Sequence, residues 1–321
     1  MGNIQKINNI RAFAIITVVF GHSIILYSSQ WGLYEPNSPC LILDYIKRFI
    51  NLYQMPLFFS ISGYLFAFRW RQRKTGQFIA NKIRRLIIPF FIIGMLWMIP
   101  IKLLLHYPNY EGQSYLGAFH MLLDGKDLGH LWYLPTLFFL FLIMYFVINA
   151  FGNTQQVWGI VLTITIVLNI FSPRIPTGGI VYLSYIYQYA WSFMIGAVIY
   201  KVKIENLPQR KIWIIVPFSI AISAFYVYIG KTNTLMASIA ILLSTYLFMT
   251  NKCYNSLDLL SKYSFGIYLF HSPLIYITYT YLLNVNPAIV ILTNFIVFGG
   301  ISFIITYLIK KKTPAKFIIG E

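Results

Sequence analysis

The chain is poor in acidic residues. It has 8 Asp and Glu against 25 Lys and Arg, and charged residues make up only 10% of it. We expect every carboxylate in a loop or at the C-terminal end, outside the long apolar runs: Glu35, Asp44, Glu111, Asp124, Asp127, Glu205, Asp258 and Glu321. This distribution argues against an intramembrane carboxylate relay, a two-carboxylate glycosidase and a triad with a buried acid.

Apolar runs of membrane-spanning length recur along most of the chain. Of the 321 residues, 58% are hydrophobic, and the mean hydropathy is +0.68. These values are far from those of a soluble protein, and we predict an all-α, polytopic membrane protein with about ten transmembrane helices. The predicted spans are 10–29, 49–68, 86–105, 131–150, 157–172, 181–200, 212–229, 234–250, 264–283 and 287–309.

The positive charge predicts the orientation. With a cytoplasmic N-terminus, all but six of the 25 Lys and Arg residues fall on the inner side. The six outer ones are Lys47, Arg48, Lys102, Lys126, Arg174 and Lys231. The positive-inside rule therefore favours both termini in the cytoplasm. A net charge of +17 distributed between apolar runs does not indicate a nucleic-acid partner.

No second folded domain is expected. No polar stretch is long enough to form one, so residues 1–321 are read as a single transmembrane domain without an appended soluble domain. The first apolar run lacks the pattern of a cleaved signal peptide and is expected to remain as a helix. Cys40 and Cys253 fall on opposite sides of the predicted bilayer, and no ligand spacing predicts a metal site.

Two connections differ in charge. The inner one, 69–85, is densely basic, and it is either a segment that contacts anionic membrane lipid or a dock for a polyanionic ligand such as a nucleotide phosphate. The outer one, 106–130, contains Glu111, Asp124 and Asp127 with a single Lys126.

Arg11 and His22 form the most informative pair. Eleven helical residues rotate by about three turns plus 20° and rise about 16 Å, so both side chains share one face of the first span. With Arg11 at the inner surface, His22 lies near the middle of the hydrocarbon layer. A buried neutral imidazole can act as a general base there. Taken alone, His22 could equally serve packing, and an isolated Arg11 is more often a topology anchor than a ligand contact.

Three other stretches combine polar residues with helix breakers. The first, 54–63, contains Pro56, Ser62 and Gly63, a combination that permits close helix approach. The second, 130–135, brings His130 and Trp132 to the outer surface, and the third, 264–273, places His271 inside the ninth span. Taken alone, the first two stretches are better explained by packing or interface anchoring, and the third is explained equally well by packing and by function.

Taken together, these residues resemble acyltransferase family 3, the integral-membrane acyltransferases that modify bacterial envelope sugars. The resemblance covers essentially the whole chain. It rests on the Arg11 to His22 spacing, Met55–Phe59 with Ser62-Gly63, Arg84-Arg85 before Pro89, the sequence HLWYLP at 130–135, and SFGIY at 264–268 with His271. Some members carry a Glu soon after the Trp of the fourth-span motif, whereas apolar residues follow Trp132 here.

The resemblance implies transfer of an acyl group, with acetyl the usual one, from cytoplasmic acyl-CoA to a hydroxyl of a surface or exported polysaccharide. It implies His22 as catalytic base and Arg11 as a residue that engages the donor. Arg84 and Arg85 would bind the CoA phosphates, while Ser62, His130, Trp132 and His271 would line the acceptor side or the cavity. The implied partners are acetyl-CoA or another acyl-CoA, a glycan on the outer side and polysaccharide-synthesis proteins, with no metal.

Two other classes of function remain open from the sequence. A transporter or flippase for a sugar, polyol or lipid-linked saccharide would suit helices rich in aromatic residues and poor in charge. A structural subunit of a glycan synthase complex would tolerate substitution of Arg11 and His22.

Overall fold

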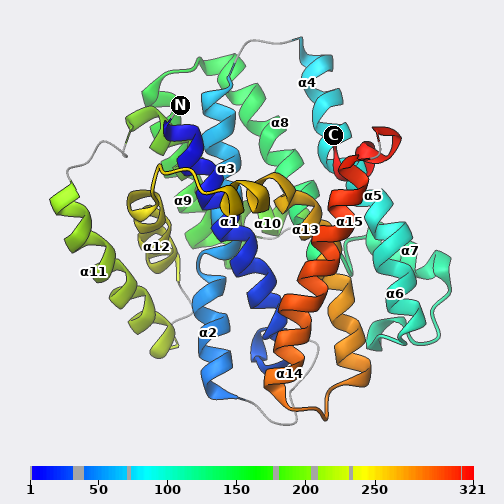
Figure 1. Ribbon diagram of the computed structural model, residues 1–321. Helices are drawn as coiled ribbons and strands as arrows, with labels where there is room; N and C mark the ends of the chain where they lie inside the picture. The colour runs from blue at the N-terminus through cyan, green and yellow to red at the C-terminus, as the bar shows by residue number, and fades with distance from the viewer. Residues whose placement is uncertain are drawn as a thin grey trace. The chain divides into compact units, whose positions relative to one another are not determined.

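The computed structural model describes residues 2–31, 40–70, 74–175, 181–203, 209–230, 234–311 and 313–321 (Figure 1). All regular elements in these ranges are helices. The all-helical prediction is therefore confirmed for the described part of the chain. Glu35, Glu205, Lys231 and residues 71–73 lie outside it.

The chain divides into two compact units. The first comprises Met1–Arg71, Tyr145–Pro176 and Tyr187–Lys262. It contains α1 (Gly2–Ser23), α2 (Leu41–Asn51), α3 (Gln54–Phe68), α9 (Gln155–Phe171), most of α10 (Val181–Val202), α11 (Gln209–Tyr228), α12 (Leu235–Phe248) and the start of α13 (Asn255–Tyr281). Within it, α1 packs on α3, and α11 runs beside α12 (Figure 1).

The second unit comprises Gln72–Met144, Thr177–Ile186 and Tyr263–Glu321. Its elements are α4 (Thr75–Lys82), α5 (Ile88–Ile93), α6 (Ile99–Leu104), α7 (Tyr115–Leu123), the larger part of α8 (Tyr133–Phe151), most of α13, α14 (Pro287–Leu292) and α15 (Gly299–Lys311). A 3-10 segment, Thr313–Ile319, follows α15 and packs on α5.

Four helical stretches of the described chain are long and apolar enough to cross a membrane. They are Thr75–Leu104, Gly129–Phe151, Gln155–Arg174 and Pro287–Lys311. In the last stretch, apolar side chains such as Ile289, Ile296 and Ile304 are more than half exposed, as expected of a helix face covered by lipid. The count of ten spans, the inward termini and the single domain remain predictions.

Helix ends differ from the predicted spans for local reasons. The first helix ends at Ser23 rather than at residue 29, because two 3-10 turns follow it. The next span begins at Gln54 rather than at residue 49, since Pro56 has no backbone N–H to donate and is tolerated only in the first turn of α3. Asp44 and Asp258, predicted in loops, lie in α2 and in the first turn of α13.

The basic connection 69–85 is helical from Thr75 onward, so this helix begins before the predicted start of the third span at residue 86. Phe78 is buried on one side of α4, and the Lys82 ammonium lies 3.2 Å from the centroid of the Phe141 ring. A π-helical turn, Ile83–Ile87, joins α4 to α5 just before Pro89. Such turns accommodate a proline, which cannot complete the regular α-helical ladder.

Two glycines allow α3 and α10 to approach closely within the first unit. A Cβ on Gly63 would lie 1.8 Å from the Phe193 carbonyl oxygen, and one on Gly196 would lie 1.8 Å from the Ser60 carbonyl oxygen. The obstacle in both cases is backbone, which cannot rotate away. This confirms the close helix approach that the stretch 54–63 predicts.

We predict that Gly63→Ala destabilises the protein by about 1–3 kcal/mol, because the added methyl group forces the two backbones apart. The melting temperature of the purified protein in detergent measures the effect. Gly159→Ala is the matched control, since Gly159 is also helical and a Cβ there meets nothing within 4 Å. Equal melting temperatures for the two variants would contradict the close packing.

Candidate functional site on the first helix

Arg11 and His22 lie on one continuous helix, α1, as the sequence predicts. Their neighbours Ile10, Ala12 and Ala14 are fully buried, whereas both polar side chains are only half-buried. By α-helical geometry they occupy one face about 16 Å apart. Helix α1 thus presents a guanidinium and an imidazole along one line, together with the partly exposed apolar side chains of Phe13, Ile16 and Phe20.

Hydrogen bonds fix the Arg11 end of α1. The Asn9 amide donates to the carbonyls of Thr250 and Lys252 at 2.8 and 2.9 Å, and the Gln5 amide donates to Asp258 at 2.7 Å. Hydrogen bonds from the Cys253 thiol and from Gln5 lower the pKa of Asp258, which keeps this carboxylate ionised as an acceptor. The start of α1 is therefore anchored to the segment that leads into α13.

A carboxylate connects the other end of α1 to α2. Asp44 accepts hydrogen bonds from Ser28 and from the backbone and hydroxyl of Ser29, and it pairs with Arg48 at 2.7 Å. Burial alone would raise the pKa of Asp44, but these hydrogen bonds and the Arg48 charge outweigh it and lower the pKa. Asp44 thereby sets the position of α2 relative to the turn after α1.

Two polar side chains that the sequence analysis did not single out lie against Gly21, the residue before His22. Lys47 is 2% exposed, and Gln54 is 6% exposed. A Cβ built on Gly21, the residue before His22, would lie 2.7 Å from Gln54 Oε1 and 3.4 Å from Lys47 Nζ. Lys47 lies in α2, outside the predicted spans, and burial lowers the pKa of its ammonium to about 7.

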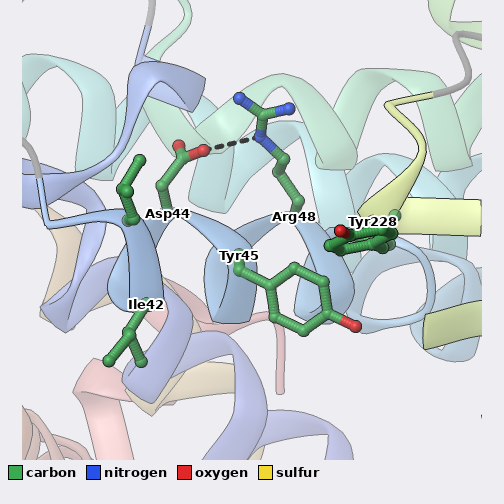
Figure 2. A pocket seen from close by; sticks show the side chains of 7 residues that line it. Ile42, Asp44, Tyr45, Arg48 and Tyr228 are labelled. Carbon is green, nitrogen blue, oxygen red and sulfur yellow. Dashed lines mark ion pairs between the residues drawn. The ribbon is translucent and has the colours of Figure 1, made fainter. Parts of the chain in front are cut away.

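Figure 2 shows a separate open pocket of about 430 Å³ on α2 and α11. Its lining residues are Leu41, Ile42, Asp44, Tyr45, Arg48, Val227 and Tyr228. The Asp44–Arg48 ion pair forms its polar side, and the Tyr45 hydroxyl donates to the Ala224 carbonyl at 2.9 Å. Neither Arg11 nor His22 lines this pocket.

The remaining predicted residue of the first unit, Ser62, is half-buried on α3. Its hydroxyl donates to the Phe58 carbonyl at 2.9 Å, one turn back along the helix. This contact is the ordinary one for a serine in an apolar helix.

In the second unit, Arg84 and Arg85 lie exposed in the π-helical turn before α5. Arg84 donates to the carbonyl of Glu321 at 3.0 Å, and the Glu321 carboxylate pairs with Lys310 at 2.5 Å. Gly320 (φ +71°) lets the chain approach this turn, since a Cβ there would lie 2.6 Å from the Arg85 carbonyl oxygen. The two guanidiniums form a basic surface that is accessible to a soluble ligand.

The structure brings the motifs around His130 and His271 together. His130 Nε2 donates to the Leu269 carbonyl at 2.9 Å, and the Tyr268 hydroxyl donates to the His130 carbonyl. The two imidazole rings lie 5.9 Å apart. Both histidines are buried, and these hydrogen bonds connect the start of α8 to α13.

The other residues of these motifs also have packing contacts. Trp132 stacks on Tyr185 at 4.5 Å, and Gly266 approaches Thr306 of α15 so closely that a Cβ would lie 2.2 Å from its methyl group. The contacts around Trp132 and Gly266 therefore position helices in the second unit.

A buried ion pair supports the turn that begins with His130. Lys102 is 1% exposed and donates to Asp127 at 2.6 Å, while the rings of Tyr107 and Tyr110 each lie 4.9 Å from its ammonium. Asp127 also accepts from the Gly129 backbone at 3.0 Å. The pair with Lys102 thus neutralises one carboxylate of the outer connection that the sequence predicts to be acidic. Residue spacing along the chain does not reveal this pairing.

We predict that Asp127→Asn destabilises the protein by about 3–5 kcal/mol, because it leaves the Lys102 charge buried without its carboxylate. Thermal unfolding in detergent measures the loss. Asp124→Asn is the control, since its pair with Lys126 is exposed and contributes about 0–1 kcal/mol. A double variant, Lys102→Met with Asp127→Asn, should recover part of the lost stability, and an equal loss in all three would refute this role.

These features define a helical membrane protein whose first helix carries an arginine and an accessible histidine. The acyltransferase domain model of the acyltransferase 3 family matches residues 4–311, nearly the whole chain. The chain belongs to that family, as its motifs predict.

A curated relative is glucans biosynthesis protein C of Escherichia coli (strain SMS-3-5 / SECEC). It is 25% identical over 135 residues, which cover 41% of this chain and 35% of the relative. The chain thus matches about a third of that relative's length. No solved structure shows significant similarity to it.

Proposed function

We propose that the protein is a membrane O-acyltransferase. It transfers an acyl group, with acetyl the first choice, from cytoplasmic acyl-CoA to a hydroxyl of a cell-surface or exported polysaccharide. Membership of the acyltransferase 3 family supports the reaction class. The observation that carries the site is the half-buried Arg11 and His22 on one face of α1.

The chemistry requires a base and a donor site. His22 accepts the proton of the acceptor hydroxyl while the hydroxyl oxygen attacks the thioester carbonyl. A carbon–oxygen bond forms, the carbon–sulfur bond breaks, and the proton leaves with the CoA thiolate. Arg11, Arg84 and Arg85 supply charge-assisted hydrogen bonds to the CoA phosphates.

The setting of the reaction follows from the charge pattern. Cationic residues concentrate on the side that we assign to the cytoplasm of a bacterial inner membrane, where acyl-CoA is available. The glycan arrives from the opposite side, together with polysaccharide-synthesis proteins. A distance of about 16 Å between Arg11 and His22 is half the hydrocarbon thickness, which an extended CoA arm must cross.

A transporter of sugars or lipid-linked saccharides would use the same helices without chemistry. The two functions differ in whether CoA is consumed. An enzyme releases free CoA thiol only when acceptor is present, whereas a carrier moves labelled sugar into vesicles without CoA release.

We predict that His22→Ala lowers acyl transfer by about 100- to 10,000-fold, the usual contribution of a general base. Purified protein is assayed with acetyl-CoA and bacterial polysaccharide, and CoA thiol and acylated glycan are both measured. His120→Ala is the control, because His120 is exposed on α7. Full transfer by a folded His22→Ala variant would rule out the assigned role.

We predict that Arg84→Ala and Arg85→Ala each raise the KM for acyl-CoA by about 10-fold, with little change in the KM for the glycan. Replacing CoA with a truncated acyl-pantetheine thioester, which lacks the nucleotide phosphates, should abolish the difference between variant and wild type. Arg174→Ala, on the opposite side in the predicted topology, serves as the control. Unchanged KM values would remove both residues from the donor site.

A further inference from the structure

The strongest unexplained feature of the first unit is a buried donor and a buried acceptor that do not satisfy each other. Lys47 of α2 is 2% exposed, and no charged group among the described residues offsets the effect of this burial on its pKa. Gln54 of α3 uses its amide nitrogen on Asn51 at 2.7 Å, but its Oε1 is buried without a partner there. Both polar atoms approach Gly21 of α1 from the same side.

Burying such groups is unfavourable. An unpaired amide oxygen costs about 1–3 kcal/mol, and a lone buried ammonium costs more. The adjacent Arg48 shows the ordinary alternative, because it extends to an exposed position and pairs with Asp44. The Lys47 ammonium instead lies close to Gly21, which comes directly before His22 in the chain and has no side chain that could pair with it.

The two atoms together specify the group that would satisfy them. The ammonium can only donate, and the amide oxygen can only accept. A phosphate or carboxylate would pair with Lys47 but would place negative charge against Gln54 Oε1. A hydroxyl accepts from one and donates to the other, so it matches both.

We propose that Lys47 and Gln54 form the subsite that binds a carbohydrate hydroxyl next to the one that is acylated. The proposal rests on the proposed function and specifies its acceptor as a neutral, polyhydroxylated sugar. Residues adjacent on an α-helix are about 100° apart, so the subsite and the His22 imidazole occupy the same level of α1 on neighbouring faces. His22 is half-exposed and marks the route by which the sugar enters.

The test measures sugar binding and stability in the same variants. Glucose, galactose and mannose oligosaccharides are titrated into the full-length protein without acyl-CoA, and tryptophan fluorescence reports the affinity. We expect Lys47→Met and Gln54→Leu each to weaken binding of the preferred oligosaccharide by about 10- to 100-fold. Both should keep or raise the melting temperature, since each removes a buried unpaired group.

Arg48→Met is the matched control, and it should leave the affinity unchanged. Three results would overturn the subsite: wild-type binding to none of the oligosaccharides, unchanged affinity in both variants, or displacement of the sugar by inorganic phosphate through Lys47. The first two results would mean that only water fills the subsite, and the third would mean that the subsite binds anions.

Failure of the proposed function gives a different result. His22→Ala should bind the oligosaccharide as the wild type does while losing transfer. If wild-type protein binds sugar through Lys47 and Gln54 but releases no CoA from acetyl-CoA, the subsite stands and the acyltransferase assignment fails.

Discussion

A polar group on a membrane helix must find a partner inside the protein, and this constraint explains most of the polar contacts described above. Hydroxyls in the apolar helices donate back to carbonyls of their own helix. Examples are Thr17 to Ala14, Ser23 to Val19, Ser60 to Leu57 and Ser302 to Phe298. Against this background, buried polar atoms without a partner stand out and indicate where a ligand could contribute the missing contact.

Most buried polar groups of the second unit meet this constraint. Lys102 has a carboxylate and aromatic rings around it, and His271 Nδ1 donates to two carbonyls at 2.9 Å. Each unit also contains a buried atom without a hydrogen-bond partner among the described residues: His130 Nδ1 in the second unit and Gln54 Oε1 in the first. Gln54 Oε1 differs in lying against Gly21 together with the buried Lys47.

Local periodicity made the central part of the site predictable from the sequence. The separation of eleven positions from Arg11 to His22 gives one helix face whatever the surroundings, and α1 has this form. Close helix approach at Gly63 was also predictable, since a glycine among small hydroxyl residues in an apolar run has few other uses. In both cases the information lies within a few helical turns.

Features that depend on distant segments were not predictable in this way. Lys47 reads as an outer-loop charge, and only the packing of α2 and α3 on Gly21 shows that it is buried. Asp127 reads as surface acid until Lys102 lies against it. A single sequence contains no signal for these pairings, because the partners come together through tertiary packing rather than through spacing along the chain.

Accessibility distinguishes the histidines as candidates for the base. His130 and His271 are buried to 6% and 1% exposure, and the nitrogens that donate to backbone carbonyls hold the rings in place. His106 and His120 are exposed in the predicted outer connection before the fourth predicted span. His22 lies in the last turn of α1 and is partly exposed, and a base that must meet both a thioester and a hydroxyl needs this access.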